Sequence, residues 1–379
     1  MVATYVDPVD GRTFPLAEPR WRSDAGRPLM VSAQPGISRS DIATRERSLW
    51  RYRAALPVDI ARPITLGEGC TPLIERERGR HRPLFKLDWF QPTGSFKDRG
   101  TSVMLSYLRE RGVASVLEDS SGNGGSSVAG YAAAGGMGVR IFAPSSTSPA
   151  KIAQVRAYGA DVELVDGPRE ASQEAAIRAA DEAFYASHNW QALFLEGTKT
   201  LAYELWEDLG FRAPDNVIVP VGAGSSLLGC WLGFRELRAA GQIARLPRLF
   251  AAQPRNCSPV EAELRGEGGR PVAPTIAEGT AIRSPLRMAQ ILQAIGETDG
   301  DAVAIREEEI VAALRRLCAD GLFVEPTSAT AAAAFDALVA RGAIRADETT
   351  VVMLSGSGLK AAERVRDLLA QPRMRGVEV

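Results

Sequence analysis

PTGSFKDRG, residues 92–100, stands between a short apolar run and a helical pattern. The run Leu84–Leu87 predicts a buried strand, and the apolar spacing over Thr101–Arg111 predicts a helix that ends at Gly112. Lys97 then lies in the first turn of that helix, at the positive end of the helix dipole. If its amine is also removed from water, the neutral form is favoured and can form a Schiff base with an aldehyde. The segment therefore predicts a fixed and reactive lysine.

The same alternation of apolar runs and helical patterns continues on both sides of this segment. The predicted strands are Leu84–Leu87, Ser115–Leu117, Val139–Ala143, Asp161–Val165, Val217–Val221, Arg248–Ala252 and Thr350–Leu354. The predicted helices are Thr101–Arg111, Ser148–Tyr158, Arg169–Tyr185, Ser225–Ala239, Glu307–Ala319, Ala329–Arg341 and Leu359–Leu369. Strand–helix alternation is typical of mostly parallel sheets covered by helices on both faces. Two such runs predict an α/β protein with two three-layer α/β/α domains. Its active site should lie in the cleft between the domains, outside the carboxyl ends of the strands.

The composition excludes several classes of protein. With 45% hydrophobic and 24% charged residues, the chain is typical of globular and not of disordered proteins. A net charge of −1 disfavours a nucleic-acid or membrane-surface partner. Two histidines leave little room for a histidine metal site or a Ser-His-Asp triad. The four cysteines form no C-x-x-C pair and the N-terminus shows no signal peptide, so we expect reduced thiols and a cytoplasmic protein.

Three glycine- and serine-rich segments follow predicted strands. They are SSGNGGSS (Ser120–Ser127), VGAGSSLLG (Val221–Gly229) and SGSG (Ser355–Gly358). Loops of this kind bring backbone N–H groups close to an anion. The dinucleotide pattern G-x-G-x-x-G fails, because Leu227 stands where its third glycine belongs, and no Walker A loop is present. A plain NAD or ATP enzyme is therefore disfavoured.

The order of these motifs resembles the fold type II (tryptophan synthase β-like) pyridoxal-phosphate enzymes. PTGSFKDRG, SSGN, the glycine loop after a strand and SGSGLK occur in that order, and GEGCTPL, EGTKTLAYEL and EPTSATAA resemble the threonine synthase-like branch. The resemblance covers roughly Leu66–Leu369. It implies pyridoxal 5'-phosphate as cofactor, a small amino-acid substrate and a homodimer. It also implies a small domain over residues 70–190 and a large domain over 1–69 with 191–379.

The resemblance also implies a role for each motif residue. Lys97 would hold the cofactor as a Schiff base and move the substrate's α-proton, with Phe96 beside it. Asn123 would bind the cofactor's ring oxygen, and Ser355 would face the pyridine nitrogen. A hydroxyl there does not keep that nitrogen protonated, which suits elimination and replacement better than transamination. The cofactor phosphate would lie on Gly222, Ala223, Gly224, Ser225 and Ser226. The substrate's α-carboxylate would lie on Ser120, Ser121, Gly122, Asn123 and Gly124. Asp98 and Arg99 would be structural, held in the helix's own network of ion pairs and hydrogen bonds.

The sequence departs from the family pattern at the N-terminus. Many members of the branch begin with a zinc ribbon, and the resemblance aligns Asp7, Asp10, Ser23 and Ala25 of this chain with its cysteines. These residues do not supply the thiolates that a structural zinc prefers. We therefore expect residues 1–30 to be a metal-free remnant of the ribbon, and we expect no metal.

Two further departures fall in the substrate pocket. Threonine synthases carry an arginine just before the L-E-G-x-K-T segment, and here that position is Phe194, which has no donor. Gly124 stands where they have threonine. O-phosphohomoserine is therefore a doubtful substrate, unless another arginine substitutes; the candidates are Arg156, Arg255, Arg283 and Arg287. His188 and Asn189 either pack in the core or line the pocket, and we leave both out of the catalytic set. Cys257 is expected in the core or the pocket wall.

These motifs imply a pyridoxal-phosphate lyase or synthase of threonine synthase type, which eliminates or replaces a β- or γ-substituent on a small L-amino acid. A serine/threonine dehydratase and a β-replacing synthase on an O-substituted serine remain alternatives. A non-catalytic metabolite-binding homologue is a further one, although the intact Lys97 argues against it.

Overall fold

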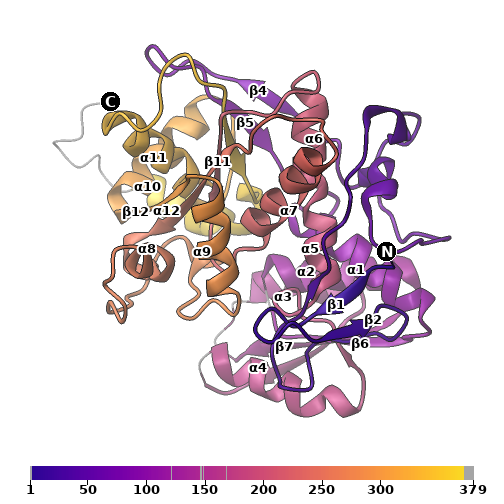
Figure 1. Cartoon of the computed structure of the whole chain (residues 1–379). Helices are drawn as coiled ribbons and strands as arrows, with labels where there is room; N and C mark the ends of the chain where they lie inside the picture. Colours follow the sequence, from indigo (N-terminus) through magenta and orange to yellow (C-terminus); the bar gives the residue numbers. More distant parts are fainter. Residues whose placement is uncertain (1, 121, 146, 148, 168, 371–379) are drawn as a thin grey trace.

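The described residues form three sheets (Figure 1). The computed structural model describes residues 2–120, 122–145, 147, 149–167 and 169–370. The largest sheet has the order β12-β11-β10-β13-β5-β4, with all neighbours parallel except β4 and β5. Its strands are β4 Leu73–Glu75, β5 Leu84–Leu87, β10 Asn216–Pro220, β11 Arg248–Pro254, β12 Asp301–Ile305 and β13 Thr350–Leu354. The second sheet is parallel throughout, in the order β8-β7-β6-β9. Its strands are β6 Ser115–Glu118, β7 Gly138–Pro144, β8 Asp161–Val165 and β9 Phe184–Tyr185.

Helices connect most of these strands. They are α1 Lys97–Glu110, α2 Asn123–Gly135, α3 Pro149–Ala157, α4 Arg169–Arg178, α5 Ala192–Thr198, α6 Thr200–Asp208, α7 Ser225–Ala239, α8 Pro259–Leu264, α9 Met288–Glu297, α10 Glu307–Ala319, α11 Pro326–Ala340 and α12 Ala362–Ala370. Short 3-10 turns lie at Arg39–Asp41, Leu49–Ala55, Ala179–Asp181, Arg255–Cys257, Glu278–Thr280 and Gly358–Ala361.

Both parallel sheets are covered on both faces, because side chains alternate along each strand. In β10, Val217 and Val219 pack with α6, α7 and α9, whereas Ile218 packs with α10, α11 and α12. In the smaller sheet, Phe142 of β7 packs with α4, whereas Ile141 packs with α2 and α3. The two three-layer arrangements confirm the predicted α/β fold class.

The N-terminal residues form a separate antiparallel sheet, β2-β1-β3, from Thr13–Pro15, Thr4–Val6 and Met30–Val31. It packs against α1: the Tyr5 hydroxyl donates to the Tyr107 hydroxyl at 3.1 Å. Of the range 70–190, β4 and β5 pair within the six-stranded sheet and the other strands form the smaller one. The domain boundaries given above stay a prediction.

One predicted helix ends early. The pattern over Arg169–Tyr185 predicts a continuous helix, but α4 ends at Arg178, and Phe184 and Tyr185 form β9. Pairing with Val116 and Leu117 of β6 outweighs helical spacing there, and the Tyr185 hydroxyl donates to Asp119 at 3.0 Å. Five other elements have the predicted bounds: Leu84–Leu87, Asp161–Val165, Ser225–Ala239, Glu307–Ala319 and Thr350–Leu354.

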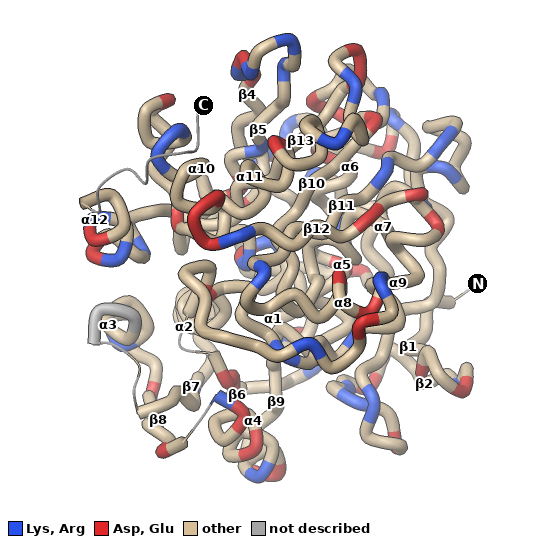
Figure 2. Tube along the Cα trace, turned by 90° about the vertical axis from the view of Figure 1, so that its left-hand side faces the viewer, with Lys and Arg blue, Asp and Glu red and all other residues tan. Residues whose placement is uncertain are grey.

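Neither sign of charge dominates the chain. Figure 2 shows basic and acidic segments interspersed over the trace, as a net charge of −1 leads one to expect. Within the described residues, no helix combines the length and the apolar character that crossing a membrane requires.

Candidate active site

The segment that carries Lys97 is fastened to the end of β13. The N–H of Phe96 donates to the carbonyl of Ser355 at 3.0 Å, and the N–H of Ser357 donates to the carbonyl of Gly94 at 3.0 Å. Ser95 forms an isolated antiparallel bridge with Gly356. Helix α1 begins directly after this contact, at Lys97. The predicted lysine and the predicted SGSG loop are therefore neighbours, although they lie far apart in sequence.

Lys97 is partly buried between two aromatic rings. Its Nζ lies 4.8 Å from the ring centre of Phe96 and 5.6 Å from that of Phe194. Burial lowers the pKa of Lys97 from its ordinary value to about 7; the charge of Arg169 lowers it further, and Glu118 and Glu325 oppose the shift. A large fraction of the amine is therefore neutral near pH 7, the nucleophilic state that covalent attachment to an aldehyde requires.

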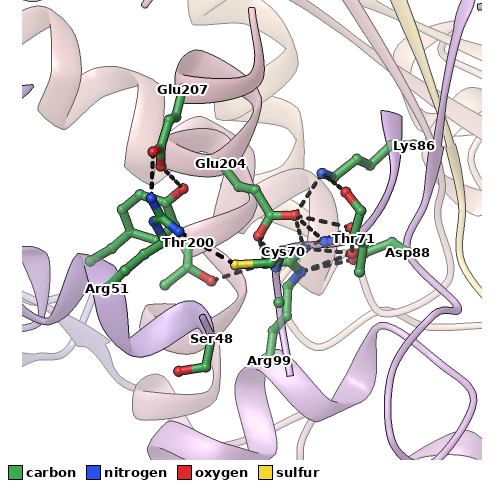
Figure 3. Close-up of polar contacts among 12 residues, drawn as sticks. Ser48, Arg51, Cys70, Thr71, Lys86, Asp88, Arg99, Thr200, Glu204 and Glu207 are labelled. Atoms are coloured by element: carbon green, nitrogen blue, oxygen red, sulfur yellow. Dashed lines mark hydrogen bonds and ion pairs between the residues drawn. The ribbon is translucent and has the colours of Figure 1, made fainter. Parts of the chain in front are cut away.

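A buried ion-pair network fixes the first turn of α1 (Figure 3). Arg99 Nη2 lies 2.6 Å from Asp88 Oδ1, and its Nη1 lies 2.9 Å from Oε2 of Glu204 in α6. Lys86 of β5 pairs with the other oxygen of Glu204 at 2.6 Å. Burial would raise the pKa of Glu204, but Arg99 and Lys86 outweigh it and hold that pKa well below its usual range. The prediction that the helix supplies its own partners is thus wrong for Arg99, whose partners are Asp88 in the turn after β5, Thr71 before β4, and Thr200 and Glu204 in α6.

Asp98 holds the turn that precedes the helix. Its carboxylate accepts hydrogen bonds from the backbone N–H of Thr93 at 2.7 Å and the hydroxyl of Thr93 at 2.6 Å. The hydroxyl of Ser127 in α2 donates to it at 2.6 Å as well. Burial raises the pKa of Asp98 to about 6, against these hydrogen bonds. Asp98 therefore ties the lysine turn to the helix that follows the SSGN loop.

The SSGN loop reaches the same place from the smaller sheet. Asn123 begins α2, and its side-chain amide donates to both oxygens of Glu325, at 3.1 and 3.2 Å. The N–H of Glu325 donates to the carbonyl of Gly356 at 3.1 Å, so one carboxylate lies between the SSGN and SGSG loops. Ser120, Gly122 and Gly124 are near this point in the chain, and Ser121 lies outside the described residues.

Glu325 is a site residue that the sequence analysis missed. It stands directly before Pro326 at the start of α11 and is only 9% exposed. The motif EPTSATAA contains it, and a carboxylate before an alanine-rich, buried helix was the available signal. Its charge raises the pKa of Lys97, against the larger effect of burial.

The third loop leads from β10 into α7. Gly224 has φ +86°, a conformation that favours glycine, and it precedes the helix that begins at Ser225. The free N–H groups of a helix N-terminus attract an anion. The Ser226 hydroxyl is buried and has no hydrogen-bond partner among the described residues. Gly222 and Ala223 complete the loop, and a Cβ on Gly222 would lie 2.9 Å from Cα of Thr280.

Ser355 lies at the end of β13 and is almost fully buried. Its Oγ lies 3.3 Å from the hydroxyl of Ser328 in α11, and that hydroxyl accepts the N–H groups of Ser355 and Gly356, each at 2.9 Å. Together, a partly neutral buried amine, an unpartnered buried hydroxyl at a helix N-terminus and a fixed serine fit pyridoxal 5'-phosphate.

Gly124 and Phe194, the two positions that depart from the family pattern, each pack against a residue of complementary size. A Cβ on Gly124 would lie 2.5 Å from Cε1 of His188, and a Cβ on Gly100 would lie 2.5 Å from the ring of Phe194. The rings of His188 and Phe194 are 5.6 Å apart. Each glycine therefore leaves space that an aromatic ring fills. Of the two positions considered for His188, in the core or lining the substrate pocket, its contact with Gly124 favours the pocket.

The four candidate arginines differ in burial. Arg156, Arg255 and Arg283 are exposed. Arg287 is buried, and its Nη2 donates to the carbonyl of Trp190 at 2.7 Å. Burial alone lowers the pKa of Arg287 to about 10. Cys257 is buried as well.

In the N-terminal segment, Arg27 joins Asp7, Asp10 and Ser23. Arg27 Nε donates to both oxygens of Asp7, at 3.0 and 2.9 Å, and its guanidinium also pairs with Asp10. The N–H of Arg27 donates to the hydroxyl of Ser23 at 3.2 Å, and Ala25 stays exposed. Within the described residues, no cluster of three or more His, Cys, Asp or Glu is arranged to hold a metal.

Known proteins resemble this chain in sequence and in fold. The model of the pyridoxal-phosphate dependent enzyme family matches residues 64–356. Threonine synthase of Methanocaldococcus jannaschii is 33% identical, covering 92% of this chain and 91% of the relative. Threonine synthase of Mycobacterium leprae is 34% identical, covering 82% and 87%.

Among solved structures, the T.th. threonine deaminase has a TM-score of 0.64 at 28% identity, covering 76% of this chain and 92% of that one. Threonine deaminase isoform 2 of Solanum lycopersicum has a TM-score of 0.69 at 22% identity, covering 89% and 96%, and shows the fold alone. The predicted cofactor and enzyme class are confirmed: the chain belongs to the pyridoxal-phosphate dependent enzyme family and is a lyase of threonine synthase type.

Proposed function

We propose that this enzyme binds pyridoxal 5'-phosphate on Lys97 and eliminates or replaces a β- or γ-substituent on a small L-amino acid. The observation that carries the proposal is the Lys97 amine, partly buried and with its pKa lowered to about 7, on a segment that hydrogen-bonds to the SGSG loop at the end of β13. The threonine synthases among its relatives support the reaction type.

Each loop then has one task. The N–H groups around Gly224, Ser225 and Ser226 hold the cofactor phosphate, together with Gly222, Ala223 and the unpartnered Ser226 hydroxyl. Asn123 turns its amide from Glu325 toward the cofactor's ring oxygen, with Phe96 packed beside the amine. The residues Ser120, Ser121, Gly122, Asn123 and Gly124 hold the substrate's α-carboxylate.

The protein's own groups control the proton transfers. Bound pyridoxal 5'-phosphate supplies an electron sink that stabilises negative charge at the substrate's α-carbon. Lys97 Nζ takes the proton from that carbon. Ser355, a neutral hydroxyl, leaves the pyridine nitrogen without a charged partner, which favours loss of a substituent over transamination. Glu325 helps to set the proton affinity of the amine, because its charge acts on Lys97.

A dehydratase remains the second candidate, and the pocket favours it. Phe194 offers no donor to a substrate phosphate, and its ring packs against Gly100. Loss of a hydroxyl from serine or threonine requires no such donor. A panel containing O-phospho-L-homoserine, O-acetyl-L-serine, L-serine and L-threonine separates the two, through release of phosphate, acetate or ammonia.

The direct test uses the protein purified with added cofactor. It should be yellow, and Lys97→Ala should lose the visible absorbance that covalent attachment produces. If the wild-type protein never acquires that absorbance, the proposal is wrong. We further propose a homodimer in the cytoplasm, as the resemblance implies; sedimentation of the purified holoenzyme checks the subunit number.

A further inference from the structure

His188 is fastened to Glu118 by two contacts to one carboxylate oxygen. Its backbone N–H donates to Oε2 at 3.1 Å, and its ring Nδ1 lies 3.0 Å from the same atom. The other oxygen of Glu118 accepts the N–H of Asp119 at 2.9 Å. Both residues are buried, and Glu118 is the last residue of β6. The imidazole therefore has a fixed position at the end of the strand that leads into the SSGN loop.

The contacts also fix which ring nitrogen carries the proton. Nδ1 faces a carboxylate oxygen, so Nδ1 carries the hydrogen and donates it. Burial lowers the pKa of His188 well below its usual value; the charges of Lys97 and Arg169 lower it as well, and Asp119 opposes them. The ring is neutral near pH 7, and Nε2 keeps its lone pair. Among the described residues, no hydrogen bond uses Nε2.

The imidazole lies beside the proposed reaction centre. A Cβ on Gly124, next to Asn123, would lie 2.5 Å from Cε1 of the ring, the atom between the two nitrogens. The ring centre is also 5.6 Å from that of Phe194, which in turn lies 5.6 Å from Lys97 Nζ. His188 thus takes the space that a side chain on residue 124 would fill, within reach of a small substrate held by Lys97.

The side chains around this position favour a substrate that carries a hydrogen-bond donor. Phe194 is apolar, Gly124 has no side chain, and the neutral imidazole offers one acceptor. An acceptor that faces a hydroxyl gains a hydrogen bond, whereas one that faces phosphate oxygens is repelled. Burying the acceptor without a donor costs free energy, so a substrate that supplies none is disfavoured.

We propose that Nε2 of His188 accepts a hydrogen bond from a hydroxyl on the substrate's side chain, so that the pocket selects a small, unphosphorylated hydroxy amino acid. This rests on the proposed function, because the substrate is held at Lys97. It narrows the substrate class from any small L-amino acid to those with a free side-chain hydroxyl.

The test is a binding titration on the holoenzyme with three matched ligands. L-threonine, L-2-aminobutyrate and O-phospho-L-threonine share a carbon chain and differ at the side-chain oxygen, which is free, absent or phosphorylated. Dissociation constants come from the change in visible absorbance. L-threonine should bind about tenfold tighter than L-2-aminobutyrate, the order of one hydrogen bond, and tighter than the phosphate ester. Equal binding of the first two, or tighter binding of the ester, overturns the proposal.

Variants separate a contact from a merely structural role. His188→Phe should weaken L-threonine binding about tenfold and leave L-2-aminobutyrate unchanged, and His188→Gln, which retains an acceptor, should recover part of the loss. Equal weakening of both ligands means that His188 only supports the fold, which contradicts the proposal. The matched control is His81→Phe, at the other histidine, which packs edge-on against Phe335.

The wild-type measurement needs no variant, so it stands even if the substituted proteins do not fold. It also separates the two proposals. Absence of visible absorbance in the holoenzyme contradicts the proposed function, whereas normal absorbance without discrimination by the hydroxyl contradicts only the role of His188.

Discussion

The proposed cofactor side and the proposed substrate side of the site are built in different ways. On the proposed cofactor side, the backbone supplies the contacts: the carbonyl of Ser355 accepts the N–H of Phe96, and Gly224 precedes the N-terminus of α7. On the substrate side, side chains interlock: His188 fills the space above Gly124, and Phe194 that above Gly100. The loops suit any reaction of this cofactor, whereas the interlocked side chains decide which molecule fits. Changes on the first side should therefore abolish chemistry, and changes on the second should redirect or weaken it.

The largest effect is expected at the amine. Lys97→Ala should lower turnover by about 10²–10⁴-fold or more, because the group that moves the α-proton is lost. Lys97→Arg is the matched control, since it keeps a cation without a neutral nucleophile. Steady-state rates with the best substrate of the panel measure the effect. Substantial turnover by Lys97→Arg would contradict the assigned role.

The network beneath α1 should matter most for stability. Arg99→Met leaves Asp88 and Glu204 buried without their shared partner, and should lower the free energy of unfolding by about 3–5 kcal/mol. Arg82→Met, which breaks exposed pairs with Glu75 and Glu77, should cost about 1 kcal/mol or less. Chemical denaturation of both variants compares them. Similar losses of unfolding free energy in the two variants would show that burial of the network adds nothing to its effect on stability.

A methyl group at residue 124 tests the interlocking directly. Gly124→Ala should cost about 1–3 kcal/mol, because the new Cβ overlaps an imidazole that Glu118 holds in place. Adding His188→Ser should remove most of that cost, since the two residues are in contact. Gly296→Ala, in α9 with open space around it, should instead stabilise the protein by about 0.5–1 kcal/mol. If the two substitutions change the free energy of unfolding additively, the proposed contact between residues 124 and 188 is contradicted.

The lowered pKa of Lys97 predicts how fast the apoenzyme takes up its cofactor. Burial lowers that pKa to about 7, so the neutral amine is present at lower pH than for an ordinary lysine. The rate of covalent attachment should rise with pH through about 7 and level off about one unit above it. Stopped-flow absorbance from about pH 5.5 to about pH 9 measures the profile on both sides of that value. A rate that keeps rising about tenfold per pH unit up to the end of this range would mean an unperturbed amine.

The smallest effect is expected in the N-terminal segment. Arg27→Met removes the cation that joins Asp7 and Asp10, and should lower the thermal midpoint by less than Arg99→Met does, because its side chain is partly solvated. A zinc chelator should leave the midpoint of the wild type unchanged. One tightly bound zinc per chain, found by metal analysis, would refute the expectation of a metal-free remnant.

The sequence predicts the features of the fold and the site that depend on neighbouring residues. Lys97 and the loops at Ser355 and Gly222 follow from strand–turn–helix patterns, and β5, β13 and α7 have the predicted bounds. The contacts that could not be predicted join distant residues. His188 and Glu118 are 70 residues apart, and Asn123 and Glu325 are 202 apart. No spacing rule connects such pairs, because only the packing of two sheets and their helices brings them together. For the same reason Arg99 was assigned partners in its own helix instead of Glu204, 105 residues away.

One measurement tests the central claim most directly. The holoenzyme is treated with borohydride, which makes the lysine–cofactor bond permanent, and its peptides are weighed by mass spectrometry. We predict that the added mass of the cofactor is found on the peptide that contains Lys97 and on no other lysine peptide. Cofactor mass on Lys86, Lys151, Lys199 or Lys360 instead, or on no peptide at all, would contradict the assignment of Lys97 as the residue that holds the cofactor.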